Sequence, residues 1–140
     1  MMGRGIDSGA VSNFMTTELI TATEDQTIQQ ICKMMSEHDI GSVVVVKRSV
    51  DGNNPIGIIT ERDIVNQIGS SELFMVQKPI REVMSYPLVT VDLTTSIREA
   101  IDIMQSKNIR RLLVVDKDSK AKGILTQKDV FKALSSSNSS

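Results

Sequence analysis

Cysteine, histidine and aromatic residues are scarce in this sequence of 140 residues. It holds one cysteine, one histidine and no tryptophan, and only 3% of the residues are aromatic. We therefore expect a core of Ile, Val, Leu and Met. A single cysteine excludes an intramolecular disulfide, and one cysteine with one histidine excludes the usual metal-ligand clusters. Cys32 lies in an apolar helical pattern, where we expect a small buried hydrophobe. His38 ends that pattern, as a cation at a helix C-terminus would.

Net charge and long apolar runs are lacking as well. The formal net charge of −1 argues against binding to nucleic acid or to an anionic membrane surface. The longest purely apolar run is Val43–Val46, far short of the roughly 20 residues of a membrane span. The first residues lead into no signal-peptide pattern, and no P-loop is present. Without a signal peptide or a membrane span, we predict a soluble cytoplasmic protein. Because neither a Ser-His-Asp nor a Cys-His arrangement is expected, we also predict that it is not an enzyme.

The sequence does contain an internal repeat. Residues 15–28 align with residues 84–97 at an offset of 69, which pairs Met15 with Met84. Further on the offset falls to 66, which pairs Gly57 with Gly123. The three extra residues of the first copy fall within residues 47–55, where Asp-Gly and Asn-Asn-Pro are turn signals. Insertions belong in turns, so the change of offset supports the alignment.

Each copy reads as strand, helix, strand, strand, helix. Residues 27–30 and 96–99 have the form of a capping box, and the helices behind them should end near His38 and Lys107. The pattern then predicts a hairpin and a second helix. The expected strands are 19–22, 43–46 and 56–59 in the first copy and 88–91, 112–115 and 122–125 in the second, and the expected second helices are 61–68 and 127–134.

The Val43–Val46 run does not alternate, which is typical of a strand covered on both faces. A unit of about 50 residues cannot easily bury such a strand alone, so we expect the copies to pack face to face. The fold class is α/β (α+β), with domains at residues 10–69 and 80–135 and a linker at residues 70–79. Residues 1–9 and 136–140, with the serine-rich end of the chain, should be disordered.

One segment of each copy suits ligand chemistry. Thr60 and Asp63, like Thr126 and Asp129, stand three residues apart at a strand-to-helix junction. One interpretation is a helix cap, in which Thr is the N-cap and Asp lies in the first turn. The other is a nucleotide site, because a helix N-terminus suits phosphate and a carboxylate accepts hydrogen bonds from a ribose. The glycine before each Thr would let the backbone approach a ligand closely. The two interpretations are compatible.

The ordered recurrence of these motifs resembles a tandem pair of cystathionine-β-synthase-type (CBS) domains, a Bateman module. The resemblance covers roughly residues 10–135. It rests on matching pairs of segments, namely 11–15 with 80–84, 40–46 with 109–115, and 57–63 with 123–129. Many family members have Pro inside the second strand, where this chain has Val44 and Leu113.

The resemblance implies two units packed through their sheets with pseudo-two-fold symmetry, leaving two clefts between the domains for adenosine nucleotides or S-adenosylmethionine. In the family the Asp holds the ribose and the Thr contacts ribose or phosphate. The base is held by backbone at the first strand and at the start of the second strand. Carried onto this chain, the ligand-binding residues are Ile20, Thr21, Ala22, Gly41, Ser42, Val43, Thr60, Arg62 and Asp63 in the first copy, and Val89, Thr90, Val91, Arg110, Arg111, Leu112, Thr126, Lys128 and Asp129 in the second.

The two copies are unequal. Arg110 and Arg111 stand where the first copy has Gly41 and Ser42, so one guanidinium faces a phosphate or the pair is a solvated strand edge. Arg62 and Lys128, beside the aspartates, are further candidates for phosphate contact.

We hypothesise a regulatory module that binds AMP, ADP or ATP, forms a homodimer as modules of this family commonly do, and signals to a separate partner. The alternatives are a structural or interaction module with empty clefts, and a module that binds S-adenosylmethionine or NAD. No catalytic cofactor is expected.

Overall fold

The computed structural model describes residues 9–50, 52–70, 76–86 and 88–136. The chain divides into two compact units, residues 20–88 and residues 1–19 with 89–140. Most of the termini expected to be disordered, and half of the expected linker, lie outside the described residues. The described ends differ from that expectation, because Ser136 ends a helix and the Gly9 carbonyl accepts from the Ile97 amide at 2.9 Å. Each unit is a three-stranded sheet with two helices, so the mixed α and β class predicted from the sequence is confirmed.

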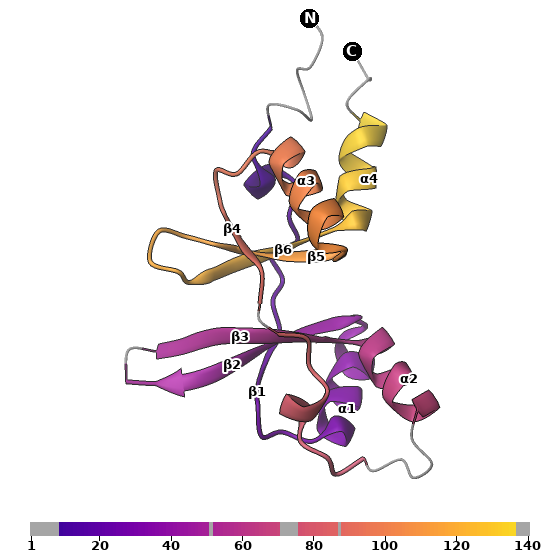
Figure 1. Ribbon diagram of the computed structural model, residues 1–140. Helices are drawn as coiled ribbons and strands as arrows, with labels where there is room; N and C mark the ends of the chain where they lie inside the picture. The colour runs from indigo at the N-terminus through magenta and orange to yellow at the C-terminus, as the bar shows by residue number, and fades with distance from the viewer. Residues whose placement is uncertain (1–8, 51, 71–75, 87, 137–140) are drawn as a thin grey trace, which may run out of the picture. The chain divides into compact units, whose positions relative to one another are not determined.

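Residues 20–88 form a sheet of order β1-β2-β3, in which β1 runs parallel to β2 and β2 antiparallel to β3. Both helices cover one face of this sheet (Figure 1). The elements in chain order are β1 (Thr21–Thr23), α1 (Ile28–His38), β2 (Ser42–Ser49), β3 (Gly52–Thr60) and α2 (Glu61–Ser70).

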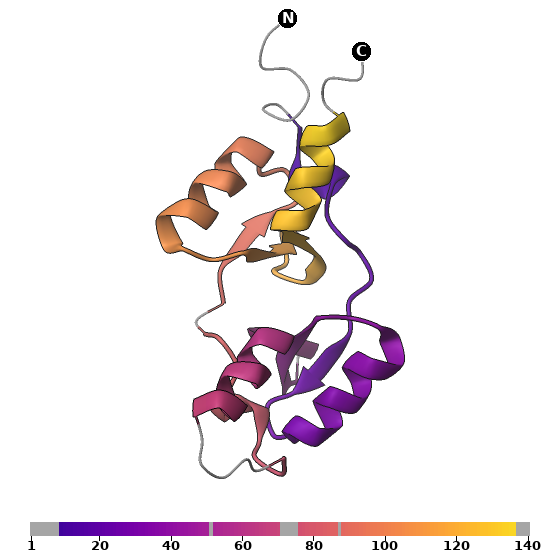
Figure 2. The ribbon, with the colours of Figure 1, turned by 90° about the vertical axis from the view of Figure 1, so that its right-hand side faces the viewer.

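The other unit repeats this arrangement with a sheet of order β4-β5-β6. Its two helices again share one face of the sheet (Figure 2). The elements are β4 (Thr90–Asp92), α3 (Ile97–Lys107), β5 (Arg111–Val115), β6 (Ala121–Thr126) and α4 (Gln127–Ser136). The first strand of each copy starts and ends later than predicted, and the second helix of each copy ends two residues later.

Local capping explains where the first helix of each copy begins and ends. Thr27 and Gln30 form a reciprocal capping box at the start of α1, and the Ser96 hydroxyl accepts from the Glu99 amide at the start of α3. Asp39 and Asn108 end the helices in the left-handed region, at φ of 52° and 53°. The predicted helix ends at His38 and Lys107 are therefore confirmed.

The core of each unit lies between its helices and its sheet. In the first, Ile28 and Ile31 of α1 pack with Val43 and Ile59 of the sheet, and all four side chains are fully buried. Val44 points to the opposite face and is also fully buried, which confirms the prediction of a strand covered on both faces. Cys32 contradicts its prediction: it is exposed, and it lines the hollow between α1 and α2 and not the face of α1 that buries Ile31.

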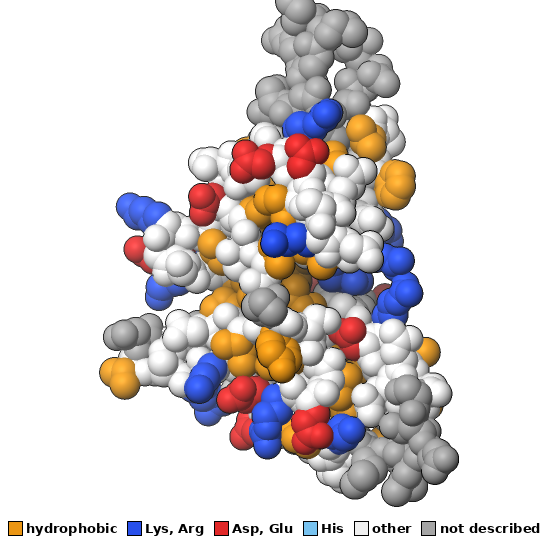
Figure 3. Space-filling model, viewed as in Figure 1, with side chains coloured by type: hydrophobic (Ala, Val, Ile, Leu, Met, Phe, Trp, Pro, Cys, Tyr) orange, Lys and Arg blue, Asp and Glu red, His pale blue; other side chains and the backbone are white. Residues whose placement is uncertain are grey.

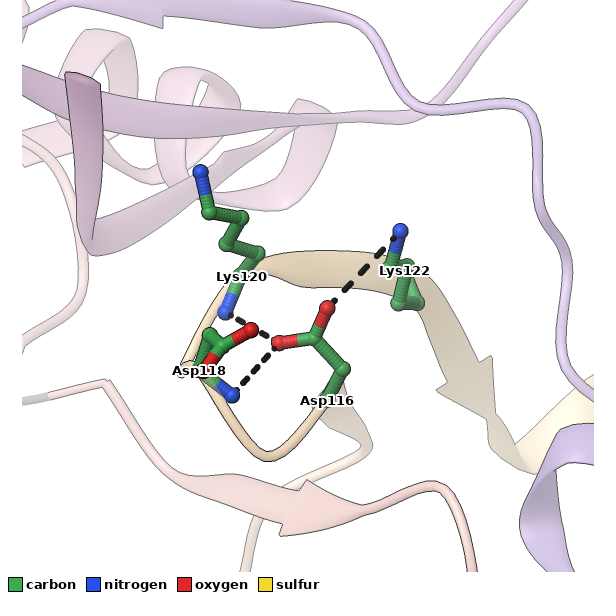
Figure 4. Close-up of polar contacts among 4 residues, drawn as sticks. All are labelled: Asp116, Asp118, Lys120 and Lys122. Atoms are coloured by element: carbon green, nitrogen blue, oxygen red, sulfur yellow. Dashed lines mark hydrogen bonds and ion pairs between the residues drawn. The ribbon is translucent and has the colours of Figure 1, made fainter.

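The two hairpins differ in length. In the first, β2 and β3 continue to Ser49 and Gly52, so the residues predicted to form a wide turn extend the strands instead. Pro55 is accommodated because it lies on an edge strand at a register shift. The second hairpin turns at Asp116, whose carboxylate accepts from the amides of Asp118 and Lys120 at 2.9 and 3.0 Å (Figure 4).

Each unit also includes the segment that precedes the other copy in sequence. Ahead of the first copy, Thr16 exchanges two backbone hydrogen bonds of 2.9 Å with Ile124 of β6. Ahead of the second copy, Ser85 pairs with Ile58 of β3 in the same way, at 2.9 and 3.2 Å. We call residues 10–16 and 80–85 the crossing segments. The sequence copies and the compact units therefore have different boundaries.

Candidate ligand site

The candidate site of the first copy is built around the turn from β3 to α2. The Thr60 amide donates to Asp63 Oδ2 at 2.8 Å, and the Asp63 amide donates to Thr60 Oγ1 at 3.1 Å. This reciprocal pair satisfies helix donors that would otherwise lack partners. The capping interpretation is thus confirmed. Asp63 Oδ1 accepts no hydrogen bond within the part of the chain that the structure describes.

The second copy has the same turn with one further contact. The Thr126 amide donates to Asp129 Oδ2 at 2.9 Å, and the Asp129 amide donates to Thr126 Oγ1 at 3.2 Å. In addition, the Thr16 hydroxyl lies 3.3 and 3.5 Å from the two carboxylate oxygens. Asp129 is 8% exposed and is the one buried charged side chain among the described residues, whereas Asp63 is half-buried.

The sheet brings the three predicted groups of each copy together. In the first copy, Ser42 is the cross-strand partner of Thr60, and the Gly41 carbonyl accepts from the Glu61 amide at 3.0 Å. The Ile20 carbonyl accepts from the Val44 amide, also at 3.0 Å. The start of β1, the start of β2 and the end of β3 are thus neighbours along the sheet.

The second copy repeats the pattern within its own unit. Arg111 is the partner of Thr126, and the Arg110 carbonyl accepts from the Gln127 amide at 3.2 Å. The Val89 carbonyl accepts from the Leu113 amide at 3.1 Å, next to Thr90. Each unit alone therefore assembles one full set of candidate residues.

Several of these residues can offer a ligand only their backbone. Ala22 and Val43 are buried in the helix-side core of one unit, as Val91 and Leu112 are in the other. Because side chains alternate along a strand, Ser42 and Arg111 point to the opposite face of their sheets. Thr60 and Thr126, their cross-strand partners, share that face.

The two adjacent arginines have different surroundings. Arg110 lines a hollow between α3 and α4, together with Gln127 and Phe131. The Arg111 Nε is buried, and no hydrogen-bond partner for it lies within the described residues. A buried donor without a partner is costly, so this nitrogen suits an anionic group that is supplied from outside. Arg62 and Lys128 are exposed on the first turns of their helices.

Gly57 in β3 and Gly123 in β6, ahead of the two turns, make room for a neighbouring backbone. A Cβ on Gly123 would lie 2.8 Å from the Thr16 carbonyl oxygen, and one on Gly57 would lie 2.8 Å from the Ser85 carbonyl oxygen. The crossing segments therefore make the close approach that each glycine allows. A glycine inside a strand is a signal for such an approach, but its partner cannot be read from the sequence.

A polar hollow of about 770 Å³ at the other end of the first sheet was not predicted. It is lined by Asp25, Lys47, Arg48 and Arg81, among others. A hydrogen bond from the Thr23 hydroxyl lowers the pKa of Asp25, and the nearby Arg48 and Arg81 charges lower it further. On the face shown in Figure 3, Lys and Arg side chains are interspersed with Asp and Glu. This mixture agrees with the near-zero net charge.

The described ranges contain no group of three or more His, Cys, Asp or Glu side chains that would hold a metal ion. None of their helices is long and apolar enough to span a bilayer.

Comparisons with known proteins point to one family. The model of the CBS domain matches residues 11–70 and 80–136. An uncharacterized protein of Methanopyrus kandleri is 38% identical over 89% of this chain and 62% of its own length. The CBS domain-containing protein YhcV of Bacillus subtilis is 34% identical over 79% of this chain and 75% of its own length. The chain thus spans less than two thirds of the first of these relatives.

Solved structures agree on the fold. The crystal structure of an uncharacterized conserved protein from Pyrococcus horikoshii has a TM-score of 0.79 and 27% identity, over 91% of this chain and 92% of that one. The CBS domain pair of protein MJ0100, solved in complex with 5′-methylthioadenosine and S-adenosyl-L-methionine, has a TM-score of 0.76 and 25% identity. That comparison covers 90% of this chain and 99% of that pair.

Proposed function

Because the chain belongs to the CBS domain family and carries two tandem copies, we propose that it is a regulatory module that binds an adenosine nucleotide, AMP, ADP or ATP. Nucleotide binding is signalled to a separate partner protein, and the module itself catalyses no reaction. The adenosine ligands in the similar CBS domain pair support the ligand class.

The aspartate of each turn carries this proposal. Asp63 Oδ2 is held by the Thr60 amide at 2.8 Å, while Oδ1 is free within the described chain. An ionised carboxylate accepts about four hydrogen bonds, so the cap leaves capacity for the two hydroxyls of a ribose. The cap also fixes the carboxylate in one orientation, which lowers the entropy lost when a ligand binds.

A phosphate is best accommodated beside the second turn. Arg111 is the cross-strand partner of Thr126, and the two side chains share one face of the sheet. Its buried Nε has no hydrogen-bond partner within the described residues. Ser42 takes the matching position in the first copy and carries no charge. We therefore expect Arg111, and not Arg110, to contact the phosphate.

A thermal-shift titration with AMP, ADP, ATP, S-adenosylmethionine and NAD tests the proposal. A ligand at 100 times its dissociation constant stabilises the folded chain by about 2.7 kcal/mol. Asp63→Asn and Asp129→Asn are the informative variants, because the amide oxygen keeps the cap and the amide nitrogen cannot accept from a ribose. Glu99→Gln is the matched control, since it changes the acid at the same position of the α3 first turn.

We expect each aspartate variant to weaken nucleotide binding at least tenfold while its unfolding midpoint stays close to that of the control. If none of the five compounds shifts the unfolding of well-folded protein, the nucleotide proposal is wrong. If the double variant binds AMP as the original chain does, the ribose role of the aspartates is wrong.

A second role, self-association, is favoured by apolar side chains that are exposed on the second helix of each copy. Val65 and Ile68 on α2 are 64% and 45% exposed, and Phe131 and Leu134 on α4 are 70% and 44% exposed. Val65 and Phe131 line the hollows between the helix pairs of their units. We propose a homodimer formed through these helices.

Light scattering tests this homodimer. The original chain should be a dimer, Phe131→Lys should be a monomer, and the control Asn66→Lys should remain a dimer. If the original chain is a monomer, the homodimer proposal is wrong.

A further inference from the structure

On the premise that the chain binds a nucleotide as set out above, we propose that Thr16 sets the affinity of the Asp129 site. Its hydroxyl occupies the edge of the Asp129 carboxylate that a ribose would take. The ligand has to displace this hydroxyl before the ribose can donate to both carboxylate oxygens.

The Thr16 hydroxyl contacts the Asp129 carboxylate where a ribose would bind, so the hydroxyl and the ribose would compete. Thr16 Oγ1 lies 3.3 Å from Asp129 Oδ1 and 3.5 Å from Oδ2, so one hydroxyl spans the two oxygens. A vicinal diol donates one hydrogen bond to each oxygen of a carboxylate and therefore approaches along the same edge. Asp129 is only 8% exposed, so few other directions of approach remain open to a ligand.

Thr16 cannot leave the site by moving its backbone. Its amide and carbonyl each form a 2.9 Å hydrogen bond with Ile124 of β6. The absence of a Cβ on Gly123 lets the Thr16 carbonyl lie against β6. Only rotation about χ1 can withdraw the hydroxyl, and a threonine has few favourable χ1 rotamers. Thr16 is therefore a side-chain latch on a fixed backbone.

The first copy lacks this latch. Ser85 takes the place of Thr16 and makes the matching backbone bonds to Ile58 at 2.9 and 3.2 Å. Within the described ranges its hydroxyl makes no hydrogen bond, and Asp63 accepts only from the Thr60 amide. Two sites with the same turn thus differ in whether their carboxylate edge is free. The ribose contact alone therefore favours occupation of the first site at a lower ligand concentration than the second site.

Calorimetric titration of AMP into single-site variants tests the latch. Asp63→Asn leaves the second site, and adding Thr16→Ala should raise its AMP affinity about three- to tenfold, the equivalent of one modest hydrogen bond. Thr16→Ser keeps the hydroxyl and should bind within about twofold of the parent. Ser85→Ala in the Asp129→Asn background is the matched control and should change affinity by less than about twofold.

Two further readouts separate a latch from a structural effect. 2′,3′-Dideoxy-AMP has no hydroxyls for Asp129, so Thr16→Ala should leave its affinity unchanged. Scalar couplings of Thr16 should report a different χ1 rotamer once the second site is saturated with AMP. An AMP affinity that Thr16→Ala lowers or leaves unchanged overturns the latch while the nucleotide function stands. A parent chain that binds no AMP overturns both.

Discussion

A methyl group added at Gly123 is expected to destabilise the unit that contains it. The new Cβ would lie 2.8 Å from the Thr16 carbonyl oxygen and 2.6 Å from the Met15 sulfur. The sulfur is at the flexible part of a side chain and can move. The carbonyl oxygen belongs to the backbone, and reaching ordinary contact at 3.4 Å would require it to retreat from β6. That movement strains the hydrogen bonds between Thr16 and Ile124.

The size of the effect follows from two opposing contributions. Overpacking of this kind costs about 1–3 kcal/mol. The substitution also restricts the unfolded chain, which stabilises the fold by about 0.4–1 kcal/mol. We therefore expect Gly123→Ala to lower the free energy of unfolding by about 1–2 kcal/mol. Gly57→Ala should act similarly, because its Cβ would meet the Ser85 carbonyl oxygen at 2.8 Å.

Urea unfolding followed by circular dichroism measures this difference, with Gly69→Ala as the matched control. Gly69 lies in α2 and a Cβ there would meet nothing within 4 Å. Its replacement should stabilise the chain, by up to about 1 kcal/mol, because alanine is the better helix former. If Gly123→Ala is as stable as Gly69→Ala, the crossing segment does not lie against β6.

Two predictions concern ionisable side chains. Backbone hydrogen bonds, the largest contribution coming from the Lys120 amide, lower the pKa of Asp116 from its ordinary value of 3.8. The ionised carboxylate therefore stabilises the fold above that pH, and this stabilisation is lost as the pH falls through the pKa of the folded state. The stability lost in Asp116→Asn should thus be greatest near neutral pH and vanish in strong acid; a pH-independent difference in urea midpoints would contradict this. Cys32 is exposed, yet desolvation raises the pKa of its thiol. A disulfide reagent should label it without denaturant, but more slowly than a free thiol at the same pH; labelling that needs urea would refute its exposure.

The helices were predictable because their signals are local. The box of Thr27 and Gln30 and the N-cap at Ser96 act within four residues, and apolar spacing behind them marks the buried face. Asp39 and Asn108 end the helices with a conformation that these two residue types tolerate well. A window of a dozen residues therefore contains the information that fixes each helix.

The crossing segments were not predictable, because their partners are distant. Thr16 meets Ile124, and no pattern around residue 16 specifies a strand more than a hundred positions away. The repeat register matched Thr16 with Ser85 but could not show that each lies against the sheet of the other copy. The same limit applies to Cys32, whose helical pattern is apolar but whose exposure depends on which face of α1 is buried.

The aspartate turn shows why the capping and ligand interpretations could not be separated by sequence. All three motif residues have structural roles in the second copy. Gly123 leaves space for the crossing segment, Thr126 caps α4, and Asp129 accepts a hydrogen bond from the Thr126 amide. The cap uses Asp129 Oδ2, and the remaining carboxylate edge is where the copies diverge. That edge meets the Thr16 hydroxyl in one unit and is free in the described part of the other. A difference in affinity that arises from the ribose contact would therefore originate outside the motif, in a residue of the crossing segment.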